Sequence, residues 1–307
     1  MIIDRLIDAI IAKRNPSVIG IDTAISLMPD DMRADIATNS DAAKKIYEFN
    51  SAVIDAVCDI APAVKVQAAC YEAYGTDGMA VFRDTLSYAR SKGLLTIADI
   101  KRNDIGSTSA KYSAAYLSVN DIGVRAEYDS DFITINGYLG SDGVKPFTDD
   151  CIKFDKGAFI LVKTSNPSSD ELQNIETASG LKIYEIMGDL VSKWGEKLTG
   201  KYGYSAIGAV VGATHKEEAN YLRRRLRSVF FLVPGYGAQG GKASELEVCF
   251  DERGLGAIIN SSRGIITAYK KSGKHYADAA RDAAIEMRED ILSALISKGK
   301  TKWLYLK

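Results

Sequence analysis

The stretch TIADIKRNDIGSTS, residues 96–109, contains the pattern that decides the fold of this chain. Its first residues are apolar and β-branched, as in a buried strand, and they run directly into alternating acids and bases. These charged residues are Asp99, Lys101, Arg102 and Asp104. Side chains two positions apart on a strand point to the same face, so Asp99 and Lys101 are expected to face together, with Ile100 turned away. The stretch predicts a buried strand that ends in a charged site.

Strand-like runs of this kind recur along the whole chain, and segments with helical periodicity lie between them. The predicted strands cover residues 17–22, 62–66, 94–100, 131–136, 157–163, 205–212, 229–234 and 256–262. Several are apolar on both faces, which is typical of parallel strands buried beneath helices. Eight such strands are compatible with a (β/α)8 TIM barrel or with a doubly wound open sheet, and the count of eight favours the α/β barrel.

No low-complexity linker divides the chain, so residues 1–307 are expected to form a single barrel domain. The first 16 residues predict an amphipathic N-terminal helix, and the chain from Gly273 onward predicts a C-terminal helix. The longest stretch between strands, at about residues 164–204, predicts an enlarged loop with a helix. The basic run RRRLR, residues 223–227, is expected on the solvated face of a helix.

The overall composition excludes several classes of protein. With 307 residues, 46% hydrophobic and 26% charged, it is ordinarily globular, and a net charge of −1 gives no general attraction to nucleic acid or anionic membranes. Asp4, Arg5 and Asp8 interrupt the apolar pattern of the N-terminus, unlike a signal peptide, and no apolar run reaches membrane-spanning length. We therefore expect a cytoplasmic protein with no nucleic-acid or membrane partner.

Cysteine and histidine usage limits the chemistry further. The four cysteines, Cys58, Cys70, Cys151 and Cys249, are scattered without a CxxC pair, which indicates free thiols rather than disulfides or zinc ligands. Only two histidines occur, His215 and His275, and each is expected at the surface or at a helix cap. A histidine-rich metal site is thereby excluded, and proton transfer falls to Lys, Asp, Glu or Tyr.

Polar residues gather where the predicted strands end. They are Asp22, Lys65, Asp99 with Lys101, Asn136, Thr164 with Ser165, Pro234, and Ser262 with Arg263. In a barrel these ends meet at one rim, where active sites form.

Two interpretations of the charges after residue 98 remain open. Asp104 could cap the following helix, with Asp99 and Lys101 as a structural ion pair. Alternatively, Lys101 is buried between the two carboxylates, which hold its ammonium charged and ready to donate a proton.

Two segments indicate a phosphorylated ligand. The glycine-rich PGYGAQGGK, residues 234–242, follows the seventh strand, and SSRG, residues 261–264, follows the eighth. Loops at these positions commonly bind phosphate through backbone N–H groups, and Arg263 adds a bidentate donor.

Four segments in order, TIADIKRNDIG, LVKTSNPS, VPGYGAQGG and IINSSRGI, resemble the orotidine 5′-phosphate decarboxylase family. The length and the TSNPS segment resemble its longer bacterial-type branch, and the likeness extends from Asp22 to Ile265. The resemblance implies decarboxylation of orotidine 5′-phosphate to UMP, the last step of de novo pyrimidine nucleotide synthesis. It also implies no metal or organic cofactor and a homodimer.

The resemblance further implies a role for each matching residue. Asp22 and Lys65 hold the ribose hydroxyls, and Asp99, Lys101 and Asp104 form the catalytic charged network. Asp104 and the neighbouring Ile105, which packs near the base, come from the second subunit.

The remaining implied residues bind the base and the phosphate. Ser165 or Thr164 recognises the pyrimidine edge, Pro234 and Gln239 belong to the closing loop, and Ser262 with Arg263 binds the phosphate. Asn136 and Asn166 are further candidates.

Two alternatives come from other classes. Magnesium-dependent sugar-phosphate decarboxylases and synthases share the DxKxxD motif, but they need an acidic ligand where this chain has Lys65 and Gln67. A non-catalytic nucleotide-binding barrel would keep the phosphate loop without needing Lys101 beside two acids.

Overall fold

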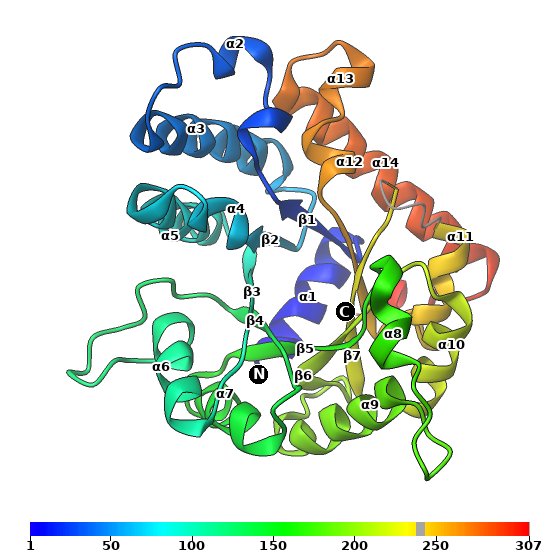
Figure 1. Cartoon of the computed structure of the whole chain (residues 1–307). Helices are drawn as coiled ribbons and strands as arrows, with labels where there is room; N and C mark the ends of the chain where they lie inside the picture. The colour runs from blue at the N-terminus through cyan, green and yellow to red at the C-terminus, as the bar shows by residue number, and fades with distance from the viewer. Residues whose placement is uncertain (238–242, 307) are drawn as a thin grey trace.

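The computed structural model describes residues 1–237 and 243–306, in which eight parallel strands close into a barrel (Figure 1). The barrel prediction is confirmed, and the open-sheet alternative is wrong. The strands are β1 (Ser17–Ile21), β2 (Ala63–Gln67), β3 (Leu95–Arg102), β4 (Phe132–Ile135), β5 (Gly157–Lys163), β6 (Ser205–Val211), β7 (Val229–Pro234) and β8 (Ala257–Ser261). Each pairs in parallel with the next, and β8 returns to β1 through Ser17 and Ile259.

Helices surround the barrel and bury its outer face. They are α1 (Ile2–Lys13), α2 (Asp30–Arg33), α3 (Asn39–Val57), α4 (Ala69–Glu72), α5 (Gly75–Ser91), α6 (Gly106–Tyr116), α7 (Ser141–Phe154), α8 (Asp170–Gln173), α9 (Ile183–Trp194), α10 (Lys216–Arg225), α11 (Ala243–Leu246), α12 (Arg263–Ile266), α13 (Tyr269–Ser272) and α14 (Tyr276–Ser297). None of the helices in these described residues is long and apolar enough to cross a membrane.

The long helices form because each carries one apolar stripe. In α3, Ile46, Phe49 and Val53 recur at helical spacing and are buried against the barrel. Thr38 caps this helix, accepting the N–H of Asp41 at 3.1 Å while the Asp41 carboxylate accepts the N–H of Thr38. The other long helices likewise pack an apolar face against the sheet, and together they form the ring of helices around the barrel in Figure 1.

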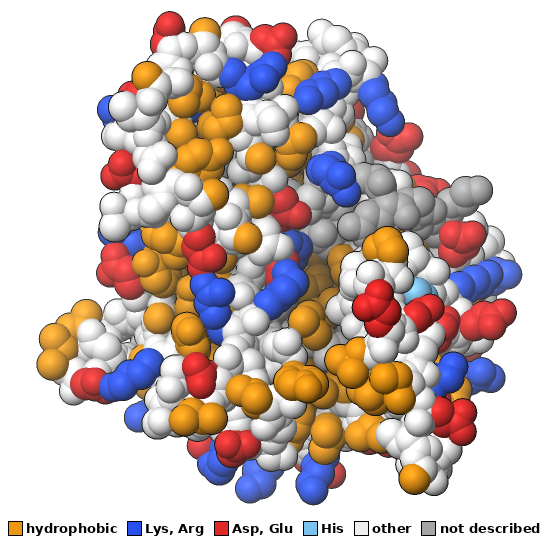
Figure 2. Space-filling model, in the orientation of Figure 1, with side chains coloured by type: hydrophobic (Ala, Val, Ile, Leu, Met, Phe, Trp, Pro, Cys, Tyr) orange, Lys and Arg blue, Asp and Glu red, His pale blue; other side chains and the backbone are white. Residues whose placement is uncertain are grey.

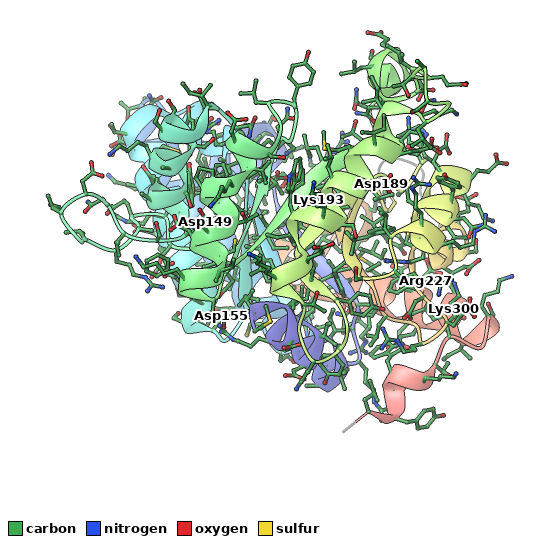
Figure 3. All side chains as sticks on the ribbon, turned by 90° about the horizontal axis from the view of Figure 1, so that it is seen from below. Asp149, Asp155, Asp189, Lys193, Arg227 and Lys300 are labelled. Carbon is green, nitrogen blue, oxygen red and sulfur yellow. The ribbon has the colours of Figure 1, made fainter. Side chains whose placement is uncertain are left out.

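Helix α1 closes the end of the barrel where the strands begin. The N–H of Ile2 donates to Asp155 at 2.7 Å, and Asp155 lies at the lower end of α7 in Figure 3. The ammonium of Lys13 donates to the carbonyls of Cys58 and Ala61, just before β2. Since α1 covers this end, a ligand has access only from the opposite end, where the strands finish.

The region between β5 and β6 contains α8, α9 and the turn that joins them. Lys163, at the end of β5, is fully buried, and its ammonium lies 2.6 Å from Asp170 and 3.1 Å from Asn174. These contacts hold α8 beside the open end of the barrel, from which it projects in Figure 3. On the outside, Arg225 of α10 donates two hydrogen bonds to Asp189, which Figure 3 labels on α9.

The expectation of a fully solvated RRRLR segment is wrong for Arg223. This side chain is buried, and its guanidinium donates to the carbonyls of Gly256, Leu226 and Val229. Arg224 is exposed, as expected. The reason is helical geometry: the segment continues α10, so one arginine turns inward while its neighbour faces water.

Candidate active site

A cavity of about 490 Å³ opens at the ends of the strands. Ten of the expected polar residues line it: Asp22, Lys65, Asp99, Lys101, Thr164, Ser165, Asn166, Pro234, Ser262 and Arg263. Figure 2 looks onto this end of the barrel, where Lys and Arg side chains gather beside a central hollow. The convergence of strand ends at one rim, inferred from sequence, is therefore seen in the structure.

Lys65 on β2 is the most deeply buried charge of the cavity. Its ammonium lies 2.7 Å from Asp99 and 3.1 Å from Asp22, and only 4% of the residue is exposed. Burial alone lowers the pKa of Lys65, but the two carboxylates outweigh burial and hold this pKa above its ordinary value. Within the described residues of this chain, the lysine buried between two carboxylates is thus Lys65, whereas Lys101 pairs with Asp99 but not with Asp104.

Asp99 on β3 is the centre of the charged network. Its carboxylate accepts hydrogen bonds from Lys65, from Gln67 at 3.0 Å, from Lys101 at 2.5 Å and from Thr134 at 2.7 Å. Burial raises the pKa of Asp99, yet the two ammonium groups and these hydrogen bonds more than offset burial and hold the pKa well below its usual range. Asp99 is therefore a fixed anion.

Lys101 lies at the edge of the cavity, with 44% of its side chain exposed. The pairing of β3 with β4 shifts register between Ala98 and Arg102, and Lys101 has a φ of 49°, in the left-handed region. Simple strand alternation therefore does not hold at this position. Its ammonium nevertheless reaches Asp99, so the predicted pair forms through an irregular strand end.

Asp104 and Ile105 do not reach the cavity of their own chain. Asp104 accepts the N–H of Ile105 at 2.7 Å, and within the described residues its carboxylate forms no ion pair with Lys101. Ile105, not Asp104, is the N-cap residue of α6, so the helix-cap interpretation of Asp104 is wrong. Ile105 is 59% exposed beside the mouth. Both side chains are available to a neighbouring molecule.

The wall formed after β5 contains Thr164, Ser165 and Gln173. The N–H of Thr164 donates to the Gln173 side chain at 2.9 Å, and the Gln173 amide donates back to the Thr164 hydroxyl at 2.7 Å. The Thr164 hydroxyl in turn donates to Asn166 at 2.6 Å. At Gly212, a Cβ would lie 2.8 Å from Ser165, so this close approach requires glycine. The wall is a preformed set of polar groups facing the cavity.

Ser262 and Arg263 form the opposite wall, where α12 begins. Ser262 packs tightly on β1, since a Cβ on Gly20 would lie 1.8 Å from its hydroxyl oxygen. The Arg263 side chain is exposed and, among the residues that the structure describes, pairs with no carboxylate. An unpaired guanidinium beside a cavity suits an anionic ligand. Gln239, expected in the adjoining loop, lies outside the described residues.

Several lining residues were missed in the sequence analysis. They are Gln67, Thr134, Leu161, Gln173, Val210, Leu232 and Asn260, whereas the lining residues Gly235, Tyr236 and Ser261 belong to the two segments expected to bind phosphate. Because side chains two positions apart on a strand share a face, Gln67 could have been predicted from Lys65, and Asn260 from Ser262. Gln173 carried no such signal, because it reaches the cavity from the end of α8 and not from a strand. Asn136, expected at the rim, is not among the lining residues of the described chain.

The floor of the cavity is apolar except at one position. Leu161, Val210 and Leu232 contribute aliphatic surface from β5, β6 and β7. Asn260 on β8 is buried, and its side-chain oxygen has no hydrogen-bond partner within the described part of the chain. The cavity thus combines a charged side at β2 and β3 with aliphatic surface from β5, β6 and β7.

The histidines and cysteines are not among the lining residues of this cavity in the described part of the chain. His215 and His275 occupy the N-cap positions of α10 and α14, as expected for surface or capping residues. The four cysteines are free. Burial raises the pKa of Cys70, on α4, to about 11, so this thiol stays protonated near neutral pH.

Comparisons with known proteins agree on one family. Residues 35–276 match the model of the orotidine 5′-phosphate decarboxylase / HUMPS family. The chain is 43% identical over 303 residues to the orotidine 5′-phosphate decarboxylase of Clostridium kluyveri, covering 98% of this chain and 99% of that protein. It is 42% identical to the enzyme of Clostridium acetobutylicum, covering 96% and 100%. The structure of Leishmania donovani OMP decarboxylase matches with a TM-score of 0.73 and 27% identity, covering 96% of this chain and 99% of that one.

Proposed function

This chain belongs to the orotidine 5′-phosphate decarboxylase / HUMPS family, and we propose that its barrel cavity converts orotidine 5′-phosphate to UMP without metal or organic cofactor. The reaction is the last step of de novo pyrimidine nucleotide synthesis. The observation that carries this function is the array of Asp22, Lys65, Asp99 and Lys101 in one cavity, opposite Arg263.

The chemical step is the cleavage of the bond between C6 of the pyrimidine and its carboxylate carbon. Carbon dioxide leaves, and the electron pair stays on C6, in the plane of the ring. The Lys101 ammonium stabilises this developing charge and donates a proton to C6, which gives UMP. Because Lys101 is half-exposed, its amine regains a proton from solvent before the next turnover.

The other charges of the network hold this ammonium in place. Asp99 binds Lys101 through one carboxylate oxygen and Lys65 through the other. An arrangement built before substrate arrives needs no reorganisation in the transition state, which is the source of electrostatic catalysis.

The remaining lining residues hold the nucleotide. Arg263 and Ser262 bind the phosphate, and Asp22 and Lys65 bind the ribose hydroxyls. Thr164 or Ser165 recognises the pyrimidine, and Pro234 lines the same cavity. Phosphate binding far from C6 supplies energy that orients the reacting bond.

The partner of this chain is a second copy of itself. We infer a homodimer in which Asp104 and Ile105 enter the neighbour's cavity. Support comes from their positions, since both lie at the mouth and neither side chain reaches its own cavity. The exposed side of Lys101 leaves room for a carboxylate from a neighbour.

The magnesium-dependent alternative is disfavoured by the position of Lys65. Its ammonium lies between Asp22 and Asp99, where it neutralises both carboxylates and would repel a divalent cation. A non-catalytic nucleotide-binding barrel has no need for Lys101 at the strained end of β3.

The test is the loss of orotidine 5′-phosphate absorbance with purified protein in excess EDTA, followed by identification of UMP. We expect full turnover under these conditions. Inhibition by EDTA that Mg²⁺ reverses would support the sugar-phosphate alternative. Nucleotide binding without turnover would support the non-catalytic barrel.

A further inference from the structure

We propose that Thr134, on β4, is a positioning residue for the decarboxylation: its hydroxyl locks the backbone of Lys101 and the carboxylate of Asp99 into one arrangement. This inference rests on the proposed function and assigns a role to a residue that the sequence motifs did not mark.

The Thr134 hydroxyl bridges the backbone of Lys101 and the side chain of Asp99, both at the end of β3. It accepts the backbone N–H of Lys101 at 3.1 Å and donates to the Asp99 carboxylate at 2.7 Å. A hydroxyl has one proton to donate and two lone pairs to accept with, so both hydrogen bonds form together. Thr134 is 1% exposed, so water does not compete for either bond from outside.

The backbone of Lys101 needs such a partner because β3 leaves its regular pairing there. Ala98 pairs with Ile133, and the next pair is Arg102 with Ile135, so the register shifts between them. Lys101 adopts a φ of 49° within this irregularity, in the left-handed region that is unfavourable for a non-glycine residue. A strained conformation of this kind persists only where its surroundings hold it.

The same hydroxyl also controls the side chain of Lys101. Asp99 Oδ1 accepts both the Thr134 hydroxyl and the Lys101 ammonium, whereas Oδ2 accepts Lys65 and Gln67. Fixing Oδ1 therefore fixes the ammonium. Thr134 thus acts on Lys101, the proton donor, in two ways: it binds the backbone N–H of Lys101, and it binds Asp99, the counter-ion of the Lys101 ammonium.

The decisive experiment compares Thr134→Val with Thr134→Ser in steady-state decarboxylation. Valine keeps the shape and removes both hydrogen bonds, so we expect kcat to fall about ten- to a hundredfold, the effect of misplacing a catalytic group. The Kd for UMP should change by less than about threefold, because Thr134 acts on the chemical step rather than on binding. Serine keeps the hydroxyl and should recover most of the rate.

The chain offers a matched control in Thr96. Its buried hydroxyl also accepts a backbone N–H, that of Asp131, and donates to a carboxylate, also of Asp131, but it lies outside the cavity. Thr96→Val should lower the melting temperature and leave kcat unchanged. If Thr134→Val fails to fold, Thr134→Cys replaces it, since a thiol is only a weak hydrogen-bond donor.

Three results would overturn the proposal. They are wild-type kcat in Thr134→Val, equal losses of kcat in the valine and serine variants, and a loss of UMP affinity that matches the loss of kcat. Turnover of orotidine 5′-phosphate by the wild-type protein is measured first. If the wild type is inactive, the proposed function fails; if the wild type is active and the variants give one of these three results, only the role of Thr134 fails.

Discussion

Two lysines in contact with the same aspartate differ in burial, and this difference assigns their roles. Lys65 is enclosed between Asp22 and Asp99, and its pKa is held above the ordinary value, so it stays charged and serves as a fixed counter-ion. Lys101 contacts Asp99 from the solvent side, where it can exchange its proton. Only Lys101 is therefore suited to deliver a proton in every cycle.

Lys101→Ala should lower kcat by about a thousandfold or more, because both charge stabilisation and the proton donor are lost. UMP binding, measured by calorimetry, should change little in comparison. Lys111→Ala, which removes an exposed lysine paired with Asp121, is the matched control and should keep full activity. A variant retaining a tenth of wild-type kcat would show that Lys101 is not the acid.

Arg263→Ala should weaken UMP binding by about 1.5–3 kcal/mol, or roughly 10- to 150-fold, because a charged phosphate partner is lost. Uridine binding should be nearly unchanged, since uridine has no phosphate. Titration of both ligands into wild type and variant measures the difference. Equal losses for the two ligands would place the phosphate elsewhere.

At the scale of elements, strand ends and loops position the site. The irregular end of β3 aims Lys101 at Asp99, and the wall after β5 is braced by buried Lys163 through Asp170 and Asn174. Helix α10 makes a purely structural contribution, since Arg223 ties the starts of β7 and β8 together through their carbonyls. Burial lowers the pKa of Arg223, and the carbonyls accept the hydrogen bonds of its buried guanidinium.

Arg223→Met should lower the free energy of unfolding by about 2–4 kcal/mol, because buried carbonyls lose their donor. Its neighbour provides the control: Arg224 is exposed, and Arg224→Met should stay within about 0.5 kcal/mol of wild type. Urea denaturation measures both. The kcat of folded Arg223→Met should equal that of wild type, and a large loss would mean that α10 contributes to the site.

At the scale of the whole molecule, one end of the barrel is sealed and the other is incomplete. Helix α1 covers the starts of the strands, so function is confined to the opposite mouth. Asp104 and Ile105, which follow the end of β3, do not line the cavity of their own chain. In the dimer proposed above, a twofold axis would bring these two residues to the neighbouring cavity, and the active unit would be a dimer.

Mixing two inactive variants tests this arrangement. Lys101→Ala and Asp104→Ala should each be nearly inactive as pure homodimers. After reversible dissociation and random exchange, half of the dimers are hybrids, and one site of each hybrid has an intact Lys101 and Asp104. Activity should then recover to about a quarter of the wild-type value. No recovery, with hybrids verified by mass spectrometry, would place Asp104 in its own subunit's site.

The amino-acid sequence by itself determined the barrel and most of its chemistry. Strand burial and helix stripes are local periodic patterns, so the strands were predicted to within one or two residues, as at GAFILVK, which is β5. The charged and phosphate-binding residues follow strand ends, which parallel topology brings to one rim.

The tertiary structure alone decided which of these groups is buried and what holds each in place. Within one chain Lys65 is enclosed by two carboxylates, because β1, β2 and β3 converge there, and Lys101 contacts only one of them. Gln173 reaches the cavity from the end of α8, and the Thr134 hydroxyl meets a backbone N–H displaced by a register shift. Such contacts join segments far apart in the chain, and no local pattern encodes them, because they depend on the distances between packed strands.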